Sequence, residues 1–331
     1  MKKAGIIGCG TIAQVHGWVL HGMEDVELTA VCDVDEEKAK VLSEQYADGR
    51  AEIYSDWRAL CAAKLDVLHI CTPHFLHVPM AVEALRCGKA VFMEKPCAIS
   101  KEQFAELVCA DAQYPGRLGF CFQNRYNETT KEMDRMISSG KIGLLTGGRA
   151  FVTWRRDEAY YQGSPWKGKW ETEGGGVLIN QSIHTLDLLL RYLGRPEKVA
   201  ATITNHHLSD FIEVEDTAEA WLSFANGKRA CFYASNGYVT DAPVLLELQG
   251  EKGSILLNGS EVTVRSEENG IEHFCCEQGN GIGKGYWGSG HRDCISDFYR
   301  CLCDGSRFPV GMEAVKATMQ TLFEIYDAGS K

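Results

Sequence analysis

The sequence predicts an α/β protein, with an N-terminal doubly wound parallel sheet of the Rossmann type and a C-terminal α+β domain that carries a large, mostly antiparallel, open-faced sheet. Two observations lead to this fold class. Roughly the first 120 residues alternate short β-rich runs with helical patterns, which is typical of a doubly wound sheet. After about residue 140, short alternating strands follow one another with few helices between them.

The strands of the first domain are expected where apolar and β-branched residues run together. Several of these runs are almost wholly apolar, as in a parallel sheet that helices cover on both faces. The stretches between them have the spacing of amphipathic helices. The expected strands are residues 3–8, 26–33, 66–72, 89–95 and 117–122, and the expected helices are 35–46, 77–88 and 101–112. We therefore expect a dinucleotide-binding domain over residues 1–122.

The second domain, for substrate binding and oligomerisation, is expected over residues 123–331. Asn226-Gly227 marks the tip of a hairpin, because both residues accept the positive φ of a tight turn. Two helices are expected at about 291–304 and 311–327, and the C-terminal one can pack back on the first domain. The expected strands are 144–154, two within 216–237, and 244–250, 254–259, 261–266 and 271–276.

The composition is that of an ordinary globular protein and excludes several function classes. The 331 residues are 45% hydrophobic and 24% charged, with a formal net charge of −11. This acidic balance, without basic runs, argues against a nucleic-acid or anionic-membrane partner. No apolar stretch approaches the roughly 20 residues that span a bilayer, and the chain enters its first strand with no room for a signal peptide. A cytoplasmic location is therefore expected.

Fourteen cysteines occur at irregular spacings and form no C-x-x-C pair. In a chain of this length without a secretory leader, most are expected to be small buried hydrophobes in a reducing compartment. The spacing of His69, His74 and His77 does not specify zinc either. No metal site is predicted.

A Gly-x-Gly-x-x-Ala turn lies between the first expected strand and a helix. Its first glycine permits the tight turn, and its second lets N–H groups at a helix N-terminus approach a pyrophosphate. A merely structural turn is the alternative. Asp33 ends the second strand, suits the ribose hydroxyls and would repel a 2′-phosphate, and no cation follows at Val34 or Asp35. NAD is therefore favoured over NADP. The predicted cofactor contacts here are Gly8, Gly10, Thr11, Ile12, Ala13 and Asp33.

The stretch Met93-Glu94-Lys95-Pro96 lies at the end of the strand expected over residues 89–95. A lysine at the carboxyl end of a parallel strand points into the crevice where ligands of such sheets bind. Its charge can stabilise a developing alkoxide or lower the pKa of a substrate hydroxyl. A surface pair between Lys95 and Glu94 is the alternative, and these residues alone do not decide between the two.

Four motifs together resemble those of the glucose-fructose oxidoreductase, inositol dehydrogenase and rhizopine-catabolism (Gfo/Idh/MocA) family. They are GCGTIA at 8–13, CTPHFLH at 71–77, GKAVFMEKP at 88–96 and GGGVLINQSIHTLDLL at 174–189. The resemblance runs over nearly the whole chain. It implies a Rossmann domain followed by an open-faced sheet domain, with a sugar or polyol bound between them over the nicotinamide.

The resemblance also implies roles for individual residues. Lys95 and His184 match the lysine and histidine of the family's two motifs, and Asn180 stands where many members carry an aspartate. His74 replaces the asparagine of the T-P-N-x-x-H loop beside the cofactor, and Gln123 falls where the family places an amide near the nicotinamide ribose. The further cofactor contacts implied in this way are Thr72, Pro73, His77, Glu94, Lys95 and Gln123.

Residues 177–191 are predicted to form one apolar helix with a polar stripe. A histidine titrates near neutral pH, so His184 is predicted to take the proton of a substrate hydroxyl. An amide cannot act as a base, so Asn180 is predicted to orient the substrate. The glycines at 174–176 can let the backbone approach a substrate, and a plain salt bridge from Asp187 to Arg191 is expected. The stripe consists of Asn180, His184, Asp187 and Arg191, at i, i+4, i+7 and i+11.

Two loops collect aromatic and polar residues that could line a sugar site. Aromatic faces stack on the C–H face of a sugar, while polar side chains bond its hydroxyls. Core packing is the alternative for the aromatic residues. Besides Asn180, the candidate substrate contacts are Tyr161, Trp166, Lys169 and Trp170 before the helix, and Tyr286 and His291 in a later glycine-rich loop.

The sequence therefore predicts an NAD-dependent oxidoreductase that acts on the CH–OH group of a sugar or polyol. The open face of the second sheet would expose apolar surface, so a homodimer or homotetramer is expected through it. Two alternatives stay open. One is an NAD-retaining glycoside hydrolase that acts by transient oxidation, and the other is a dinucleotide-sensing regulator without turnover.

Overall fold

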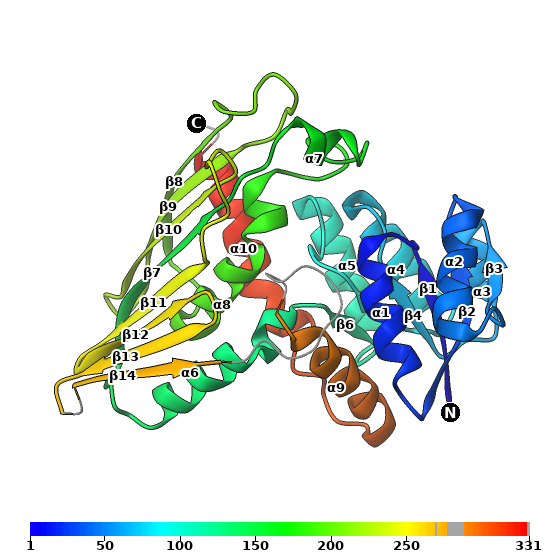
Figure 1. The fold of residues 1–331 in the computed structure, drawn as a ribbon, viewed down its shortest axis with the longest axis horizontal. Coiled ribbons are helices and arrows are strands. Elements are labelled where there is room, and N and C mark those ends of the chain that lie inside the picture. Colours follow the sequence, from blue (N-terminus) through cyan, green and yellow to red (C-terminus); the bar gives the residue numbers. More distant parts are fainter. Residues whose placement is uncertain (269, 277–287, 330–331) are drawn as a thin grey trace. The chain divides into compact units, whose positions relative to one another are not determined.

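The computed structural model describes residues 1–268, 270–276 and 288–329 (Figure 1). The chain forms two compact units, and each is built from two separate stretches. The first unit comprises Met1–Tyr126 and Gly279–Ala314, and the second comprises Asn127–Gln278 and Val315–Lys331. The predicted division into residues 1–122 and 123–331 differs from this mainly in Gly279–Ala314, which belongs to the first unit.

The first unit contains a six-stranded sheet in which all neighbouring strands are parallel. The order along the chain reverses beside β1, which makes the space between β1 and β4 the topological switch point where such sheets bind ligands. The predicted doubly wound sheet is confirmed. In sheet order its strands are β3 (Glu52–Tyr54), β2 (Val26–Cys32), β1 (Lys2–Ile7), β4 (Val67–Ile70), β5 (Ala90–Met93) and β6 (Leu118–Phe120).

Helices cover this sheet, and their packing explains the apolar strands. All four residues of β4 and all four of β5 are buried. Strand β3 and helix α3 are missing from the sequence prediction, because β3 has three residues of which none is buried and α3 is too short for a periodic pattern. The helical segments are α1 (Thr11–His21), α2 (Glu36–Ala47), α3 (Trp57–Ala62), η1 (His74–Leu76), α4 (His77–Arg86), α5 (Lys101–Gln113), η2 (Gln123–Tyr126) and α9 (Gly290–Asp304).

Helix α9 belongs to the first unit although it comes late in the chain. The Phe298 ring lies 5.2 Å from the Phe92 ring of β5, centroid to centroid. A Cβ atom on Gly119 of β6 would lie 2.7 Å from the Phe298 ring, so glycine is needed at that point of the strand. The Tyr126 hydroxyl donates a hydrogen bond of 2.8 Å to Asp297. The predicted helix at about 291–304 is thus confirmed and packs within the first unit.

The second unit contains an eight-stranded sheet. The pair β7 and β10 is parallel, and the other neighbouring strands are antiparallel. The predicted large, mostly antiparallel sheet is therefore confirmed. The Asn226-Gly227 turn joins β9 to β10, with Gly227 at φ 80°. In sheet order the strands are β14 (Gly270–Cys275), β13 (Glu261–Ser266), β12 (Gly253–Asn258), β11 (Leu245–Gly250), β7 (Leu145–Thr153), β10 (Arg229–Ser235), β9 (Thr217–Ser223) and β8 (Lys198–Thr204).

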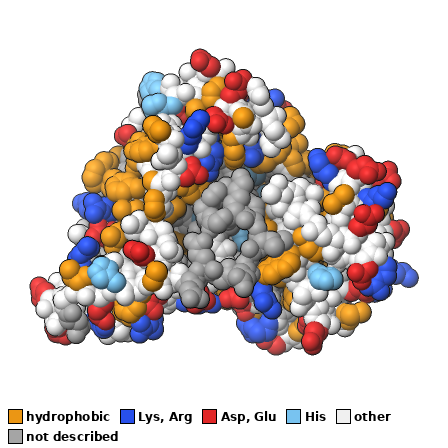
Figure 2. Space-filling view, viewed as in Figure 1, with side chains coloured by type: hydrophobic (Ala, Val, Ile, Leu, Met, Phe, Trp, Pro, Cys, Tyr) orange, Lys and Arg blue, Asp and Glu red, His pale blue; other side chains and the backbone are white. Residues whose placement is uncertain are grey.

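Helices α8 and α10 lie along one face of this sheet (Figure 1). On β9, Ala218, Ala220 and Leu222 are buried, whereas Trp221 between them is 65% exposed on the other face. Figure 2 shows hydrophobic side chains gathered at the left of the view, where the sheet lies. The helical segments of this unit are α6 (Glu128–Ser138), α7 (Glu158–Gln162), η3 (Val177–Gln181), α8 (Ile183–Leu193) and α10 (Met312–Gly329).

Among the helices of the described residues, none has both the length and the apolar character that crossing a membrane requires.

Candidate active site

Residues predicted to contact a cofactor lie at one edge of the six-stranded sheet. Each follows the end of a different strand: Gly8 after β1, Asp33 after β2, Thr72 after β4, Lys95 after β5 and Gln123 after β6. Because the strands are parallel, these carboxyl ends share one edge, where ligands of doubly wound sheets bind. The structure therefore brings the separate sequence motifs of the first unit together.

The glycine turn has the backbone that the motif requires. Gly8 has φ +86°, and a Cβ there would lie 2.7 Å from the Cys71 carbonyl oxygen. Gly10 is exposed just before α1 begins at Thr11, and a Cβ on it would meet nothing within 4 Å among the described residues. The start of α1 is thus open to a ligand, and the amides of its first turn can bind an anion such as a pyrophosphate.

Asp33 is fixed against this turn. Its Oδ2 accepts a hydrogen bond of 2.7 Å from the Cys9 N–H, and its Oδ1 accepts one of 2.9 Å from the Asp35 N–H. A carboxylate has about four acceptor positions, so two remain for the hydroxyls of a ribose. Val34, the next residue, is 95% exposed and brings no cation.

Gln123 carries an unsatisfied group at the same edge. The side chain is 3% exposed, and within the described part of the chain its Oε1 accepts no hydrogen bond. A buried carbonyl oxygen without a donor costs free energy unless a ligand or water supplies one. Together with the open Gly10 and the oriented Asp33, this acceptor fits the binding of a dinucleotide.

His77 ties two of the loops at this edge together. Its Nδ1 lies 2.8 Å from the Pro96 carbonyl oxygen and its Nε2 lies 2.9 Å from that of Thr72. Burial lowers the pKa of His77, and these backbone contacts act in the opposite direction. The fully buried His77 ring therefore holds the Thr72-Pro73 loop against the turn that carries Lys95.

Glu94 ends a buried chain of hydrogen bonds. His16 Nε2 lies 3.0 Å from Glu94 Oε1, His16 Nδ1 lies 2.9 Å from His69 Nδ1, and His69 Nε2 lies 2.9 Å from the Tyr299 hydroxyl. Burial would raise the pKa of Glu94, but the hydrogen bond and charge of His16 outweigh it and hold this pKa well below its usual range. An ionised Glu94 also accepts from the Lys95 N–H at 3.3 Å. This series of hydrogen bonds thus holds the turn next to Lys95, the predicted catalytic lysine.

Three potential metal ligands meet in this network. One atom each of His16, Glu94 and Cys121 lies within 4.8 Å of the others. The hydrogen bond between His16 and Glu94 already occupies two of these atoms. Burial raises the pKa of the Cys121 thiol well above its usual value, which disfavours the thiolate that binds metals. The chemistry of the three residues therefore fits a hydrogen-bonded cluster.

His291, a candidate substrate contact, lies in the first turn of α9 and is 5% exposed. Burial lowers its pKa to about 4, although the charge of Glu94 acts in the opposite direction and that of Lys95 in the same one. His291 is therefore a neutral ring close to Glu94 and Lys95. Its predicted companion Tyr286 lies outside the described residues.

The helix predicted over residues 177–191 is interrupted in the second unit. Val177–Gln181 forms a π-helical turn, and α8 begins at Ile183. At the junction the Ser182 hydroxyl donates to the Val177 and Leu178 carbonyls. Asn180 and His184 are both partly exposed but lie on different segments, so the prediction of one straight polar stripe is wrong.

The glycines before this turn approach other parts of the protein. A Cβ on Gly175, which has φ +149°, would lie 1.9 Å from the Tyr326 hydroxyl, and one on Gly176 would lie 1.9 Å from the Glu215 carbonyl oxygen. The Glu215 side chain accepts hydrogen bonds from the N–H groups of Gly176 and Leu178. Gly175 and Gly176 thus serve close packing on α10 and on the segment before β9, rather than the predicted approach to a substrate.

The remaining members of the stripe have partners other than those predicted. Asp187 is 1% exposed and accepts a hydrogen bond of 2.8 Å from Thr318 of α10. Arg191 pairs through both terminal nitrogens with Asp134 of α6. The predicted salt bridge between Asp187 and Arg191 is therefore replaced by two tertiary contacts, which a local pattern cannot specify.

The aromatic loop, residues 161–170, contains both packed and accessible side chains. Tyr161 is 6% exposed, packs with Leu208, Ile212 and Val214, and its hydroxyl accepts from Asn236, so the structure assigns it to a small core. Lys169 and Trp170 are exposed and Trp166 is partly so. The Trp170 indole N–H donates to the Glu213 carbonyl, and its ring lies 5.5 Å from that of Tyr326.

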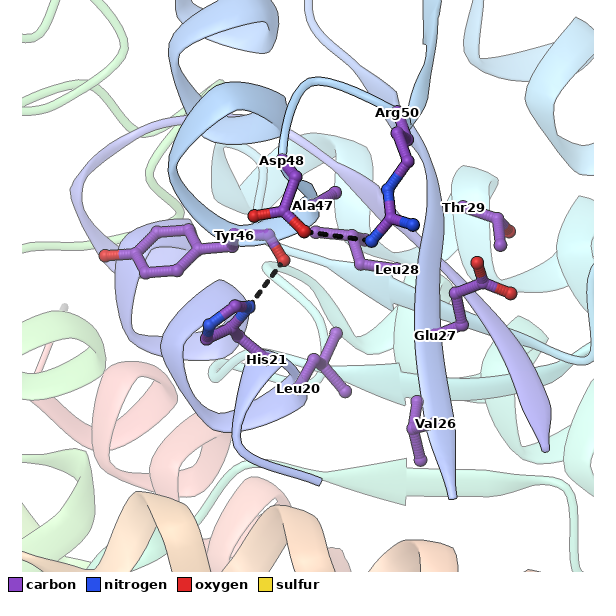
Figure 3. A pocket seen from close by; sticks show the side chains of 10 residues that line it. All are labelled: Leu20, His21, Val26, Glu27, Leu28, Thr29, Tyr46, Ala47, Asp48 and Arg50. Carbon is purple, nitrogen blue, oxygen red and sulfur yellow. Dashed lines mark hydrogen bonds and ion pairs between the residues drawn. The ribbon is translucent and has the colours of Figure 1, made fainter. Parts of the chain in front are cut away.

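A cavity of about 240 Å³ lies elsewhere in the first unit (Figure 3). It is lined by the beginning of β2, including Glu27 and Thr29, and by His21 and Arg50. These residues lie at the amino end of β2, whereas Asp33 follows its carboxyl end. The cavity is therefore separate from the edge that carries the cofactor motifs.

Glu173 and Glu215 are two buried carboxylates that are not among the candidate residues predicted from the sequence. Glu173 is 0% exposed and accepts from Asn180 Nδ2, and Glu215 is 2% exposed beneath the π-helical turn. Their signal in the sequence is weak: one directly precedes the triple glycine, and the other opens an alternating strand. Burial raises the pKa of Glu215 from 4.5 to about 7.

Comparison with known families gives two matches. Residues 2–119 match the oxidoreductase family with an NAD-binding Rossmann fold, GFO/IDH/MocA, and residues 130–256 match the GFO/IDH/MocA C-terminal domain. The two matches fall on the two units described above and together cover most of the chain.

Individual proteins are similar over different lengths. D-glucoside 3-dehydrogenase of Escherichia coli (strain K12) is 35% identical over 202 residues, which are 59% of this chain and about half (54%) of that protein. Inositol 2-dehydrogenase of Rhizobium meliloti (strain 1021) is 26% identical over 261 residues, 76% of this chain and 74% of that protein. The crystal structure of the WlbA dehydrogenase from Bordetella pertussis, in complex with NADH and UDP-GlcNAcA, has a TM-score of 0.85 at 26% identity and covers 99% of this chain and 96% of its own.

Proposed function

Because this chain belongs to the GFO/IDH/MocA family of oxidoreductases with an NAD-binding Rossmann fold, we propose that it is an NAD-dependent dehydrogenase of a sugar or polyol. It would transfer a hydride between a hydroxyl-bearing carbon of that substrate and the nicotinamide. The observation that carries the proposal is the gathering of Gly8, Gly10, Asp33, Lys95 and Gln123 at one edge of the parallel sheet.

The relatives support this substrate class. D-glucoside 3-dehydrogenase and inositol 2-dehydrogenase are named for the oxidation of a glucoside and a cyclic polyol, and D-apiose dehydrogenase of Paraburkholderia graminis for a sugar. All three are dehydrogenases of compounds with several neighbouring hydroxyl groups. We propose a free or activated compound of this kind as the substrate.

The proposed cofactor contacts follow from the geometry of the first unit. When bound, NAD supplies the hydride acceptor. The N–H groups at the start of α1 would bind its pyrophosphate, the remaining acceptor positions of Asp33 would receive its ribose hydroxyls, and Gln123 Oε1 would receive a donor from it. The carboxylate of Asp33 would disfavour the 2′-phosphate of NADP.

Two side chains are proposed to act on the substrate hydroxyl. Lys95 would stabilise the oxygen as negative charge develops on it, and His184 would accept its proton. Lys95 is suited to this because the Glu94 carboxylate and the His77 ring hold its turn. Asn180, an amide, would orient the substrate.

A panel of sugars, polyols and nucleotide sugars with NAD or NADP tests the proposal, with reduced cofactor read at 340 nm. With the best substrate, Lys95→Met and His184→Ala should each lower kcat by about a hundredfold or more, as for the loss of an acid–base group. Lys40→Met, at an exposed lysine of α2, is the matched control and should leave kcat unchanged. Unchanged kcat in the Lys95 and His184 variants would refute their roles.

The same assay separates the proposal from its alternatives. Steady accumulation of NADH supports a dehydrogenase. Release of an aglycone without net NADH would instead identify a glycoside hydrolase that retains NAD, and tight NAD binding without any turnover would identify a sensor.

We also propose that the uncovered face of the eight-stranded sheet forms a homo-oligomer. Trp221, 65% exposed at the middle of β9, would then be buried against a second copy. Trp221→Arg should shift the mass measured by light scattering toward the monomer, whereas Val41→Arg, at an exposed position of α2, should not. An unchanged mass in the Trp221 variant would refute this interface.

A further inference from the structure

Glu173 is a buried carboxylate that joins two parts of the second unit. Its side chain is 0% exposed. Its Oε1 accepts a hydrogen bond from Asn180 Nδ2, and its Oε2 accepts one from the Gly168 N–H, each with an N···O distance of 2.5 Å. The carboxylate therefore connects the aromatic loop around Gly168 to the π-helical turn that carries Asn180.

This arrangement sets the orientation of the Asn180 amide. Both oxygens of the Glu173 carboxyl group act as acceptors, because the Gly168 N–H donates to Oε2 and the Asn180 NH₂ group donates to Oε1. The amide must then turn its NH₂ group toward Glu173, so its carbonyl oxygen Oδ1 lies on the opposite side. Rotation of the amide by half a turn would place Oδ1 against Oε1, which puts two acceptors in contact.

We propose that Glu173 is a positioning residue, which makes Asn180 a hydrogen-bond acceptor toward a hydroxyl group of the substrate. This inference rests on the proposed function and deepens it. Asn180 is partly exposed, so a ligand can reach it. At this point the site would recognise a group that donates a hydrogen bond, as the hydroxyl of a sugar or polyol does and an ether or carbonyl oxygen does not.

The geometry predicts that the carboxylate and the amide can exchange places. In the double variant E173Q/N180D, the new amide can donate to the new carboxylate while its own carbonyl accepts from the Gly168 N–H. Both hydrogen bonds are then kept, and only the direction of one is reversed. Position 180 still presents an acceptor on its far side. A role of Glu173 as a simple buried charge would not predict this rescue.

The single variants should fail in different ways. In E173Q the new amide uses its carbonyl for Gly168 and turns its NH₂ toward Asn180, which then has to rotate and present its donor to the substrate. We expect kcat/KM to fall roughly tenfold, mainly through KM, as for one lost hydrogen bond. In N180D two carboxylates meet and must share a proton, so kcat/KM should acquire a new pH dependence in the neutral range.

The experiment compares wild type, E173Q, N180D and E173Q/N180D in steady-state kinetics from pH 6 to 9 and in thermal unfolding. The double variant should regain kcat/KM to within about threefold of wild type, a pH profile like that of wild type, and most of the lost Tm. The matched control E173Q/N180A, which has no partner for the new amide, should regain neither. A substrate analogue O-methylated at the recognised hydroxyl should lose the difference between wild type and E173Q.

Each of the other possible outcomes contradicts one part of the proposal. A double variant as impaired as the worse single variant in both kinetics and Tm overturns the pairing. Recovery of Tm without recovery of KM overturns the role of Asn180 as a substrate acceptor. If no sugar or polyol supports NAD reduction by the wild type, the proposed function is wrong. The Tm values of the four proteins then test the pairing of Glu173 with Asn180 independently.

Discussion

Replacement of Glu215 by glutamine should remove a pH dependence from the stability of the second unit. The Glu215 carboxylate accepts hydrogen bonds from the N–H groups of Gly176 and Leu178 and from the Tyr326 hydroxyl. Burial raises its pKa from 4.5 to about 7, although these hydrogen bonds act in the opposite direction. In the unfolded chain the carboxyl group is solvated, and its pKa returns to the ordinary value.

The sign of the effect follows from which state binds the proton more tightly. Because the pKa is higher in the folded state, the contribution of Glu215 to stability is present below pH 4.5 and is lost as the pH rises toward 7. The difference between 4.5 and about 7 corresponds to ~3 kcal/mol in the free energy of unfolding, of which ~2.5 kcal/mol falls between pH 5 and pH 8.

Urea unfolding of wild type and Glu215→Gln at several pH values from 5 to 8 measures this effect. His69, His77 and His291, whose pKa values burial lowers, titrate in both proteins and cancel in the difference. The stability of the variant relative to wild type should therefore rise by ~2.5 kcal/mol from pH 5 to pH 8. A difference that stays constant over this range would refute the idea that the buried carboxyl group keeps its proton near neutral pH.

Three other expectations concern a close contact, the cofactor and the thiols. Gly175→Ala should lower the free energy of unfolding by ~3 kcal/mol in urea titrations, because its Cβ would collide with the Tyr326 hydroxyl, whereas Gly194→Ala, whose Cβ would meet no atom of the described residues within 4 Å, should cost only ~1 kcal/mol. Equal losses in the two would contradict the contact. Asp33→Ser should raise KM for NAD about tenfold and reduce the preference over NADP in initial-rate assays; an unchanged ratio would argue against its role at the ribose. Iodoacetamide at pH 8 should label the exposed Cys109 well before Cys9, whose pKa burial raises to about 12, and mass spectrometry of early peptides would expose the reverse order.

The gathering of the predicted cofactor residues at one edge of the parallel sheet could be predicted from sequence because its signals are local. The first strand, the glycine turn, α1 and Asp33 lie within one short stretch, and the apolar runs of β4 and β5 mark buried parallel strands. The structure adds what the pattern cannot contain, such as the hydrogen bond from the Cys9 N–H to Asp33 and the buried acceptor of Gln123.

The candidate substrate residues of the second unit were less predictable because their geometry depends on residues distant in sequence. The helical pattern over 177–191 contains no sign of the break after Gln181, since the start of that segment is held by Glu215, which precedes β9, and by Tyr326 of α10. The same holds for Asp187, whose partner Thr318 comes from α10. Local periodicity identified the polar residues but could not decide which of them face one another.

Helix α9 also bears on the order in which the protein can fold during synthesis. The six strands of the parallel sheet leave the ribosome early, yet Phe92 packs on Phe298 and His69 bonds to Tyr299, 230 residues later in the chain. Part of the apolar interior of the nascent first unit therefore stays uncovered until the whole eight-stranded sheet has been synthesised. A ribosome stalled just before α9 should hold a unit that proteases still cut, and one stalled after the last residue of α9 has emerged should hold a protected one.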